Sequence, residues 1–185
     1  MIRFKIPIVI VFTFFFGIRN LNAQQLSIEK VREQFFAMDK TKDGALNLYK
    51  SLENADLSKS PVLLAYRGAS SAASAGSVSG VRKKFDYFNR GKSELEEAVN
   101  LMHLDAEIRF LRLATQINAP GFLGYSGDIK SDKSIVINTL TSVNANHPNA
   151  YLYLRICRFM IANAALASSE KNTVNQLIVK FNTTK

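Results

Sequence analysis

The spacing of apolar residues after Gln24 is the feature that most constrains the fold. Apolar side chains recur three and four positions apart along nearly all of this region, and the alternation of apolar and polar residues that marks a strand is almost absent. Such spacing predicts helices that each present one apolar stripe. We therefore expect an all-α protein, a bundle or short solenoid of antiparallel helix pairs with about eight or nine helices.

The predicted helices are separated by short breaks rich in Gly, Pro, Asp and Asn. The residues predicted to be helical are about 28–38, 46–52, 61–75, 81–89, 94–102, 106–117, 131–142, 149–167 and 170–182. Ser93-Glu94-Leu95-Glu96 has the spacing of a capping box, so we expect one helix to end near Arg90-Gly91 and the next to begin here. Segment 149–167 is apolar on nearly all sides and is expected to lie centrally.

The first 23 residues have the composition of a secretory signal peptide. Arg3 and Lys5 precede an apolar run over residues 6–18, and Ala23 supplies a small residue before a cut. An uncleaved anchor is the alternative, but a run of about 13 residues spans only ~20 Å as a helix, against the ~30 Å of a bilayer core. We expect cleavage, and a secreted or periplasmic protein.

Residues 24–185 have the length of a single all-helical domain. Removal of the leader lowers the formal net charge from +9 to +6, because the leader carries three basic residues and no acidic one. The densest basic cluster, at residues 82–84, is followed by aromatic residues, but export and the dispersed charge argue against a nucleic-acid partner. One cysteine excludes an internal disulfide framework and a multi-cysteine zinc site.

One helix is predicted to have a face almost free of bulk. Ala65, Gly68, Ala69, Ala72 and Ala73 recur at helical offsets, which would let a neighbouring helix approach closely. The alternative is that the small residues from Ser70 to Gly80 form a flexible linker. We favour a helix to about residue 75 because apolar residues line its other side.

Two resemblances follow from these patterns. The segment over residues 91–99 resembles the second helix of a tetratricopeptide repeat, and the small face over residues 65–73 resembles the close packing of that family. The chain as a whole is similar to small secreted helical proteins of Gram-negative bacteria with no assigned function. The resemblances imply a helical fold and an exported location, and they imply no active site.

Residues 39–50 resemble the calcium loop of an EF-hand. Asp39, Thr41 and Asp43 fall at the first, third and fifth loop positions, and Gly44 falls at the sixth. The twelfth position needs a bidentate carboxylate to close the oxygen cage, and here it is Lys50. We therefore predict a turn, with Gly44 in a left-handed conformation and Asp43 capping the next helix. A calcium-binding module stays a less favoured alternative.

The groups that could support catalysis are few. His103 and His147 are the only histidines, and they lie 44 residues apart with no metal-ligand spacing, which favours surface or capping roles. Cys157 lies in an apolar run, which favours a buried thiol. The glutamates of residues 94–97 suit the first turn of any helix, although paired carboxylates could serve a hydrolase. We predict no catalytic residue, cofactor or metal, and keep an envelope hydrolase as the alternative.

Five residues are candidates for a partner-binding surface. Arg67, Arg109 and Arg112 lie on predicted helices and could line a concave surface that receives an acidic peptide, with Phe122 and Tyr125 as anchors on the adjacent loop. Alternatively, these arginines lie on solvated outer faces. The sequence thus predicts an exported, non-catalytic module of the cell envelope that binds or scaffolds a protein or peptide.

Overall fold

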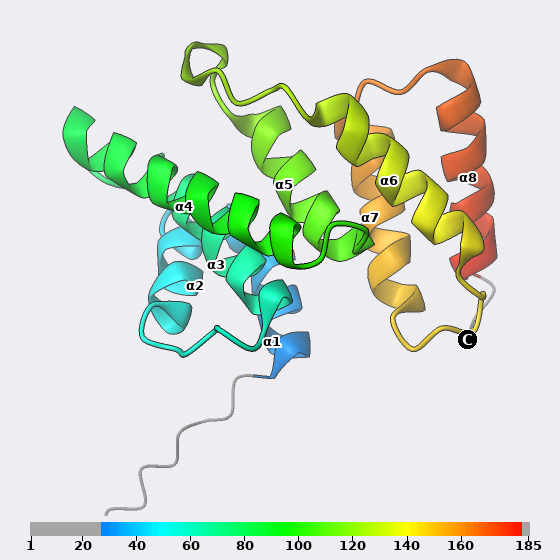
Figure 1. Ribbon diagram of the computed structural model, residues 1–185, viewed down its shortest axis with the longest axis horizontal. Coiled ribbons are helices and arrows are strands. Elements are labelled where there is room, and N and C mark those ends of the chain that lie inside the picture. Colours follow the sequence, from blue (N-terminus) through cyan, green and yellow to red (C-terminus); the bar gives the residue numbers. More distant parts are fainter. Residues whose placement is uncertain (1–26, 183–185) are drawn as a thin grey trace, which may run out of the picture.

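The computed structural model describes residues 27–182 and confirms the all-α class (Figure 1). Within this range there are eight α-helices, two short 3-10 helices and no strand. The α-helices are α1 (Ile28–Phe36), α2 (Gly44–Leu52), α3 (Pro61–Ser74), α4 (Val81–Leu101), α5 (Ala106–Asn118), α6 (Ile129–Ser142), α7 (Ala150–Asn163) and α8 (Ser168–Asn182). The 3-10 helices are η1 (Met38–Lys40) and η2 (Gly121–Leu123).

Successive helices pack as neighbours, and α5 lies between the two halves of the structure. Helix α3 packs against α2 and α4, α5 against α6, and α7 against α8, while α5 also contacts α3, α4 and α7 (Figure 1). Ten of the 13 residues of α5 are buried. The expectation that residues 149–167 lie centrally is wrong, because α7 packs chiefly on α8 and leaves Tyr151 and Arg158 exposed.

Helix α4 is continuous, so the break predicted at Arg90-Gly91 is wrong. Gly91 lies inside α4, where it crosses α3 at Gly68. A Cβ atom on Gly91 would lie 2.4 Å from the carbonyl oxygen of Gly68. The glycine therefore allows two backbones to touch rather than ending a helix. The small face predicted over residues 65–73 serves this crossing.

The buried apolar residues form one main cluster to which all eight helices contribute. A member from each helix in chain order is Val31, Leu48, Tyr66, Leu95, Phe110, Leu140, Ile156 and Leu177. A second, smaller cluster consists of Ala72, Phe88 and Tyr125, where α3, α4 and the loop after η2 meet. This smaller cluster lies beside the candidate site described below.

The predicted signal peptide, residues 1–23, lies outside the described residues, so its cleavage and the export of the protein stay predictions. In the part of the chain from 27 to 182, we find no helix that combines the length and apolar character needed to cross a membrane. The resemblance to tetratricopeptide repeats stays a prediction as well.

Candidate functional site: an apolar groove beside α4

Arg109 and Arg112 are buried in an ion-pair network between α5 and α6. Both donate to Oδ1 of Asp132 at 2.8 Å, and Arg112 also donates from Nε to Oδ2 at 2.8 Å. Gln116 donates a further hydrogen bond to Oδ2 at 2.8 Å. The expectation that these two arginines face an open surface is therefore corrected, because a fully buried carboxylate on α6 takes up their charge.

The same network holds the loop between α5 and α6. Arg112 donates to Glu96 on α4 at 2.6 Å, and the Tyr125 hydroxyl donates to the other oxygen of Glu96 at 2.7 Å. The backbone N–H of Asp128 donates to the Gln116 side chain at 3.0 Å. Burial, with the hydrogen bond to Glu96, raises the pKa of Tyr125 well above its ordinary value. Tyr125 is thus a buried anchor of the loop and not an exposed one.

Arg67 lies apart from this network. Its Nε donates to Oε1 of Glu94 at 3.1 Å, and its Nη1 donates to the carbonyl of Ala55 at 3.4 Å. The second oxygen of Glu94 is buried without a hydrogen-bond partner among the described residues, and burial raises the pKa of this carboxyl. The structure therefore does not bring the three arginines together on one surface.

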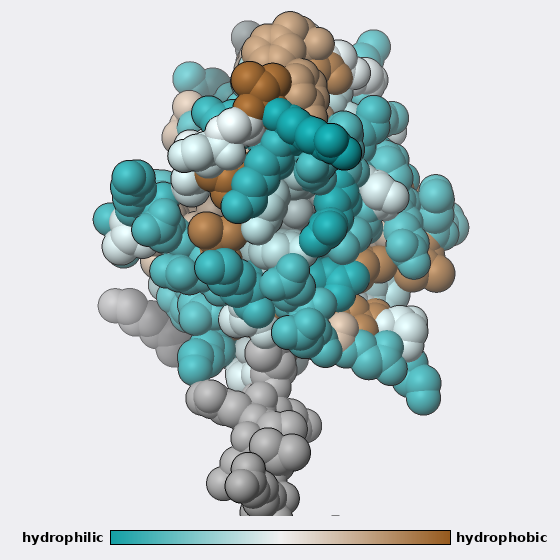
Figure 2. Space-filling model, turned by 90° about the vertical axis from the view of Figure 1, so that its left-hand side faces the viewer, coloured by the Kyte–Doolittle hydropathy of each residue, from teal (hydrophilic) through white to brown (hydrophobic). Residues whose placement is uncertain are grey.

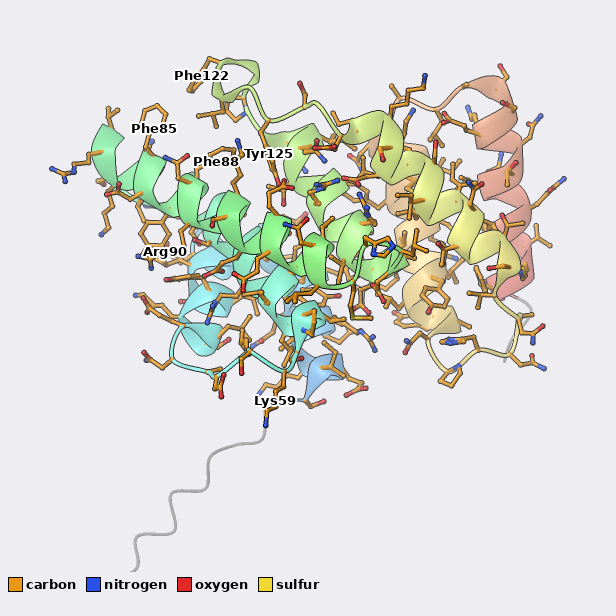
Figure 3. The ribbon with its side chains drawn as sticks, viewed as in Figure 1. Lys59, Phe85, Phe88, Arg90, Phe122 and Tyr125 are labelled. Carbon is orange, nitrogen blue, oxygen red and sulfur yellow. The ribbon has the colours of Figure 1, made fainter. Side chains whose placement is uncertain are left out.

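Phe122 is the one predicted anchor that faces solvent, and it borders a groove of about 860 Å³. Its side chain is 80% exposed. Phe85 and Phe88 rise from α4 toward the loop that carries Phe122 and Tyr125 (Figure 3). Viewed from the end at which α4 begins, hydrophobic residues gather at the top of the molecule (Figure 2).

The groove has aromatic walls and a floor of small residues. The phenylalanines that line it are Phe35, Phe36, Phe85, Phe88, Phe122 and Phe159. Ala69, Ala72, Ala73 and Gly76 line it from α3 and the residues just after it, and Ala73 is exposed. An open apolar groove of this kind favours a ligand that contributes apolar side chains or an apolar chain of its own.

The polar side chains that line the groove donate to their own helices. Thr115 donates to the carbonyl of Leu111 at 2.9 Å, and Asn118 donates to that of Ala114 at 2.8 Å. Asn163 likewise donates to the carbonyl of Phe159 at 3.0 Å. Lys84 and Asp39 are the charged residues among the described groove-lining ones. Apart from the Lys84 ammonium and the second amide hydrogens of the two asparagines, the groove therefore presents a mainly apolar surface to a ligand.

The candidate catalytic groups have different contacts and different degrees of burial in the fold. His103 is exposed in the turn after α4, and Nδ1 of His147 accepts a hydrogen bond from the backbone N–H of Asn149 at 3.0 Å, next to the start of α7. Cys157 is fully buried, and burial raises the pKa of its thiol to about 12. The glutamates of residues 94–97 include two that pair with arginines of different helices. The buried position predicted for Cys157 is confirmed.

The loop that resembles an EF-hand is a turn of a different kind from the one predicted. Residues 38–40 form η1, and Asp43 occupies the N-cap position of α2 without a hydrogen bond from its side chain. Gly44 does not have a positive φ. A Cβ atom there would lie 2.2 Å from the carbonyl oxygen of Met38, so the glycine permits close backbone contact. Among residues 27–182, no three His, Cys, Asp or Glu side chains converge to hold a metal ion.

A comparison of the chain with protein-family models, with curated proteins and with solved structures finds no match among any of them. The site is therefore interpreted from its own residues. The groove was not predicted from the sequence, because most of its apolar lining residues belong to helical stripes that we assigned to the core. Val81, Phe85 and Phe88, spaced four and three apart on a highly charged helix, were the available signal.

Proposed function

We propose that this protein is an exported, non-catalytic helical protein that binds a partner protein or peptide in the groove beside α4. The observation that carries the proposal is the exposure of Phe122, together with that of Val81 (72%) and Phe85 (42%), around one apolar groove. Large apolar side chains that gather at a concave surface are typical of a recognition site. Scattered single ones would need no such explanation.

The two alternative functions gain no comparable support. A hydrolase would need an acid and a base that face the same cavity. Glu96 and Glu97 line one open hollow along α4, but both carboxylate oxygens of Glu96 already accept hydrogen bonds, from Arg112 and Tyr125, and neither histidine lines that hollow. A calcium module would need a cage of oxygens, and position twelve of the loop is Lys50, on α2. The groove remains the feature that a binding function explains best.

Selection of peptides on the purified protein tests the proposal. A library of random peptides displayed on phage is expected to yield binders with two or more large apolar anchors. Substitution Ala73→Trp places an indole on the groove floor, and Phe122→Ala removes an exposed wall. Each is expected to weaken the selected peptides by about tenfold or more, which is the loss of one good anchor.

Val179→Ala is the matched control, because Val179 is 65% exposed on α8 and does not line the groove. Circular dichroism of each variant reports whether the helices are retained. Selected peptides that bind the Ala73→Trp variant as tightly as the original protein would place the binding surface elsewhere, and the proposal would be wrong.

A further inference from the structure

We infer that the occupant of the groove is an amphipathic α-helix of a partner protein whose acidic residues lie over the first turn of α4. The inference rests on the proposed function and specifies the chemistry of the partner. It follows from three properties of the described residues: the polar groups inside the groove, the shape of its floor and the charge at the start of α4.

The polar groups favour a ligand whose backbone is already hydrogen-bonded. Thr115, Asn118 and Asn163 each donate to a carbonyl of their own helix. The row of carbonyl groups on an extended peptide would then find only the second amide hydrogens of the two asparagines and the Lys84 ammonium as side-chain donors in the groove. A helix satisfies its backbone internally and presents only side chains to the groove. An extended strand would be left with buried, unpaired polar groups.

The floor has the form that a docking helix needs. Ala69 and Ala73 lie one turn apart on α3, and Gly76 follows just after the end of the helix, beyond the point where Gly68 meets α4. Small residues let a second helix axis come close, as α4 itself does at the crossing. The phenylalanine walls would then contact residues at i, i+3, i+4 and i+7 of the incoming helix.

The charge at the first turn of α4 favours a negative partner. Arg82, Lys83 and Lys84 are exposed there, and this turn contains no acidic residue. Cations at a helix N-terminus are electrostatically unfavourable, because the helix dipole is positive at that end. No side chain caps the helix, since Gly80 occupies the N-cap position. Acidic side chains of a partner would neutralise the cations and approach the uncapped N–H groups.

The groove begins at this same turn. Val81, Lys84 and Phe85 line it, so apolar and electrostatic contacts with one ligand are adjacent. A second copy of this chain docking end to end would bring the same cations together, and like charges oppose that arrangement. The basic first turn and the apolar groove therefore both favour a partner helix that is apolar on one face and acidic at one end.

Three synthetic helices test the inference. Each is an amphipathic peptide of about four turns with leucines at i, i+3, i+4 and i+7. The three peptides differ only at one end, which carries Glu residues in the first, Gln residues in the second and Lys residues in the third. Fluorescence anisotropy at low ionic strength is expected to give about tenfold tighter binding for the Glu peptide than for the Gln peptide, as two or three surface charge contacts would produce, and the weakest binding for the Lys peptide. Salt is expected to reduce the difference.

The variant R82Q/K83Q/K84Q is expected to bind the Glu and Gln peptides within about twofold of each other, because the cations that distinguish them are gone. A matched control for loss of charge is the set of three exposed lysines outside the groove, substituted in K59Q/K130Q/K171Q. This control is expected to keep the full preference for Glu.

The outcomes separate the inference from the proposed function. Equal binding of the three peptides overturns the inference of an acidic partner helix. Binding of anionic phospholipid vesicles by a protein that binds none of the peptides overturns it as well. If peptides selected by phage display still bind and lose affinity in the Ala73→Trp variant, the proposed function stands while the inference is wrong. Self-association abolished by Ala73→Trp would instead identify a second copy as the occupant and would also overturn the inference.

Discussion

At the scale of the residue, Asp132 is the polar group on which the packing of α5 against α6 depends most. It is fully buried and accepts four hydrogen bonds, two from Arg112 and one each from Arg109 and Gln116. Its loss would leave two buried guanidinium groups without their carboxylate, which costs more than the pair itself contributes.

We predict that Asp132→Ala lowers the free energy of unfolding by about 3–5 kcal/mol, measured by urea denaturation followed by circular dichroism. Asp128→Ala is the control, because the Asp128 side chain is 51% exposed and 3.7 Å from Arg112. It is expected to change stability by less than about 1 kcal/mol. Equal effects of the two substitutions would show that Asp132 does not hold the network together.

The sequence predicted some polar contacts and not others, for a physical reason. Asp105 directly precedes the helix predicted over residues 106–117, where aspartate favours the N-cap position, and its side chain accepts from the N–H of Ile108 at 2.9 Å. A helix cap joins residues three apart in the chain, so it can be predicted from a short stretch of sequence. The pairing of Arg109 with Asp132 joins two helices, and it depends on how they dock, which the spacing of apolar residues does not specify.

At the scale of the element, the unbroken α4 depends on the glycine crossing with α3. Glycine inside a helix costs about 1 kcal/mol relative to alanine, and the capping box at Ser93 favours a break, so local propensity argues for two helices. Tertiary packing outweighs this local preference for a break, because Gly91 and Gly68 allow the backbones of α3 and α4 to come into contact. The continuous α4 in turn carries Phe85 out to the groove.

We predict that Gly91→Ala destabilises the protein despite its better helix propensity. The new Cβ would lie 2.4 Å from the Gly68 carbonyl oxygen and 2.5 Å from the backbone nitrogen of Ala72, and neither atom can move without shifting α3. Overpacking of this kind costs about 1–3 kcal/mol. The measurement is the midpoint of urea denaturation for each variant.

Gly127→Ala is the matched control for this substitution. Gly127 has no positive φ, and nothing lies within 4 Å of a Cβ added there. Its substitution is expected to change stability by no more than about 0.5 kcal/mol. A Gly91→Ala protein as stable as the control would mean that α3 and α4 can separate at little cost.

At the scale of the whole molecule, the sequence predicted the helices better than their arrangement. Amphipathic periodicity and caps are local, so the class and most helix positions were confirmed. The groove was not predicted, because it forms where residues of α1, α3, α4, α5, α7 and η2 meet without filling the space between them. Phe122 was predicted as an anchor, but the other residues that line the groove with it could be identified only from the structure.

The interior of the molecule also contains a thiol and two phenol groups that would lose their protons at alkaline pH if they were exposed to water. Burial raises the pKa of Cys157 from 9.0 to about 12 and raises the pKa of Tyr66 and Tyr125 well above 10.0. In the unfolded chain these groups lose their protons near their ordinary pKa values, while the folded protein keeps them. The unfolded state then binds fewer protons, so the free energy of unfolding falls as pH rises.

We predict that the free energy of unfolding declines between pH 9 and 12, by up to about 1.4 kcal/mol per pH unit for each group that ionises only on unfolding. Urea denaturation at a series of pH values measures the slope. Tyr125→Phe is expected to reduce the slope above pH 10, and Tyr151→Phe is the control because Tyr151 is exposed. A stability that stays flat from pH 8 to 11 would mean that these side chains titrate freely in the folded protein and that its interior admits water.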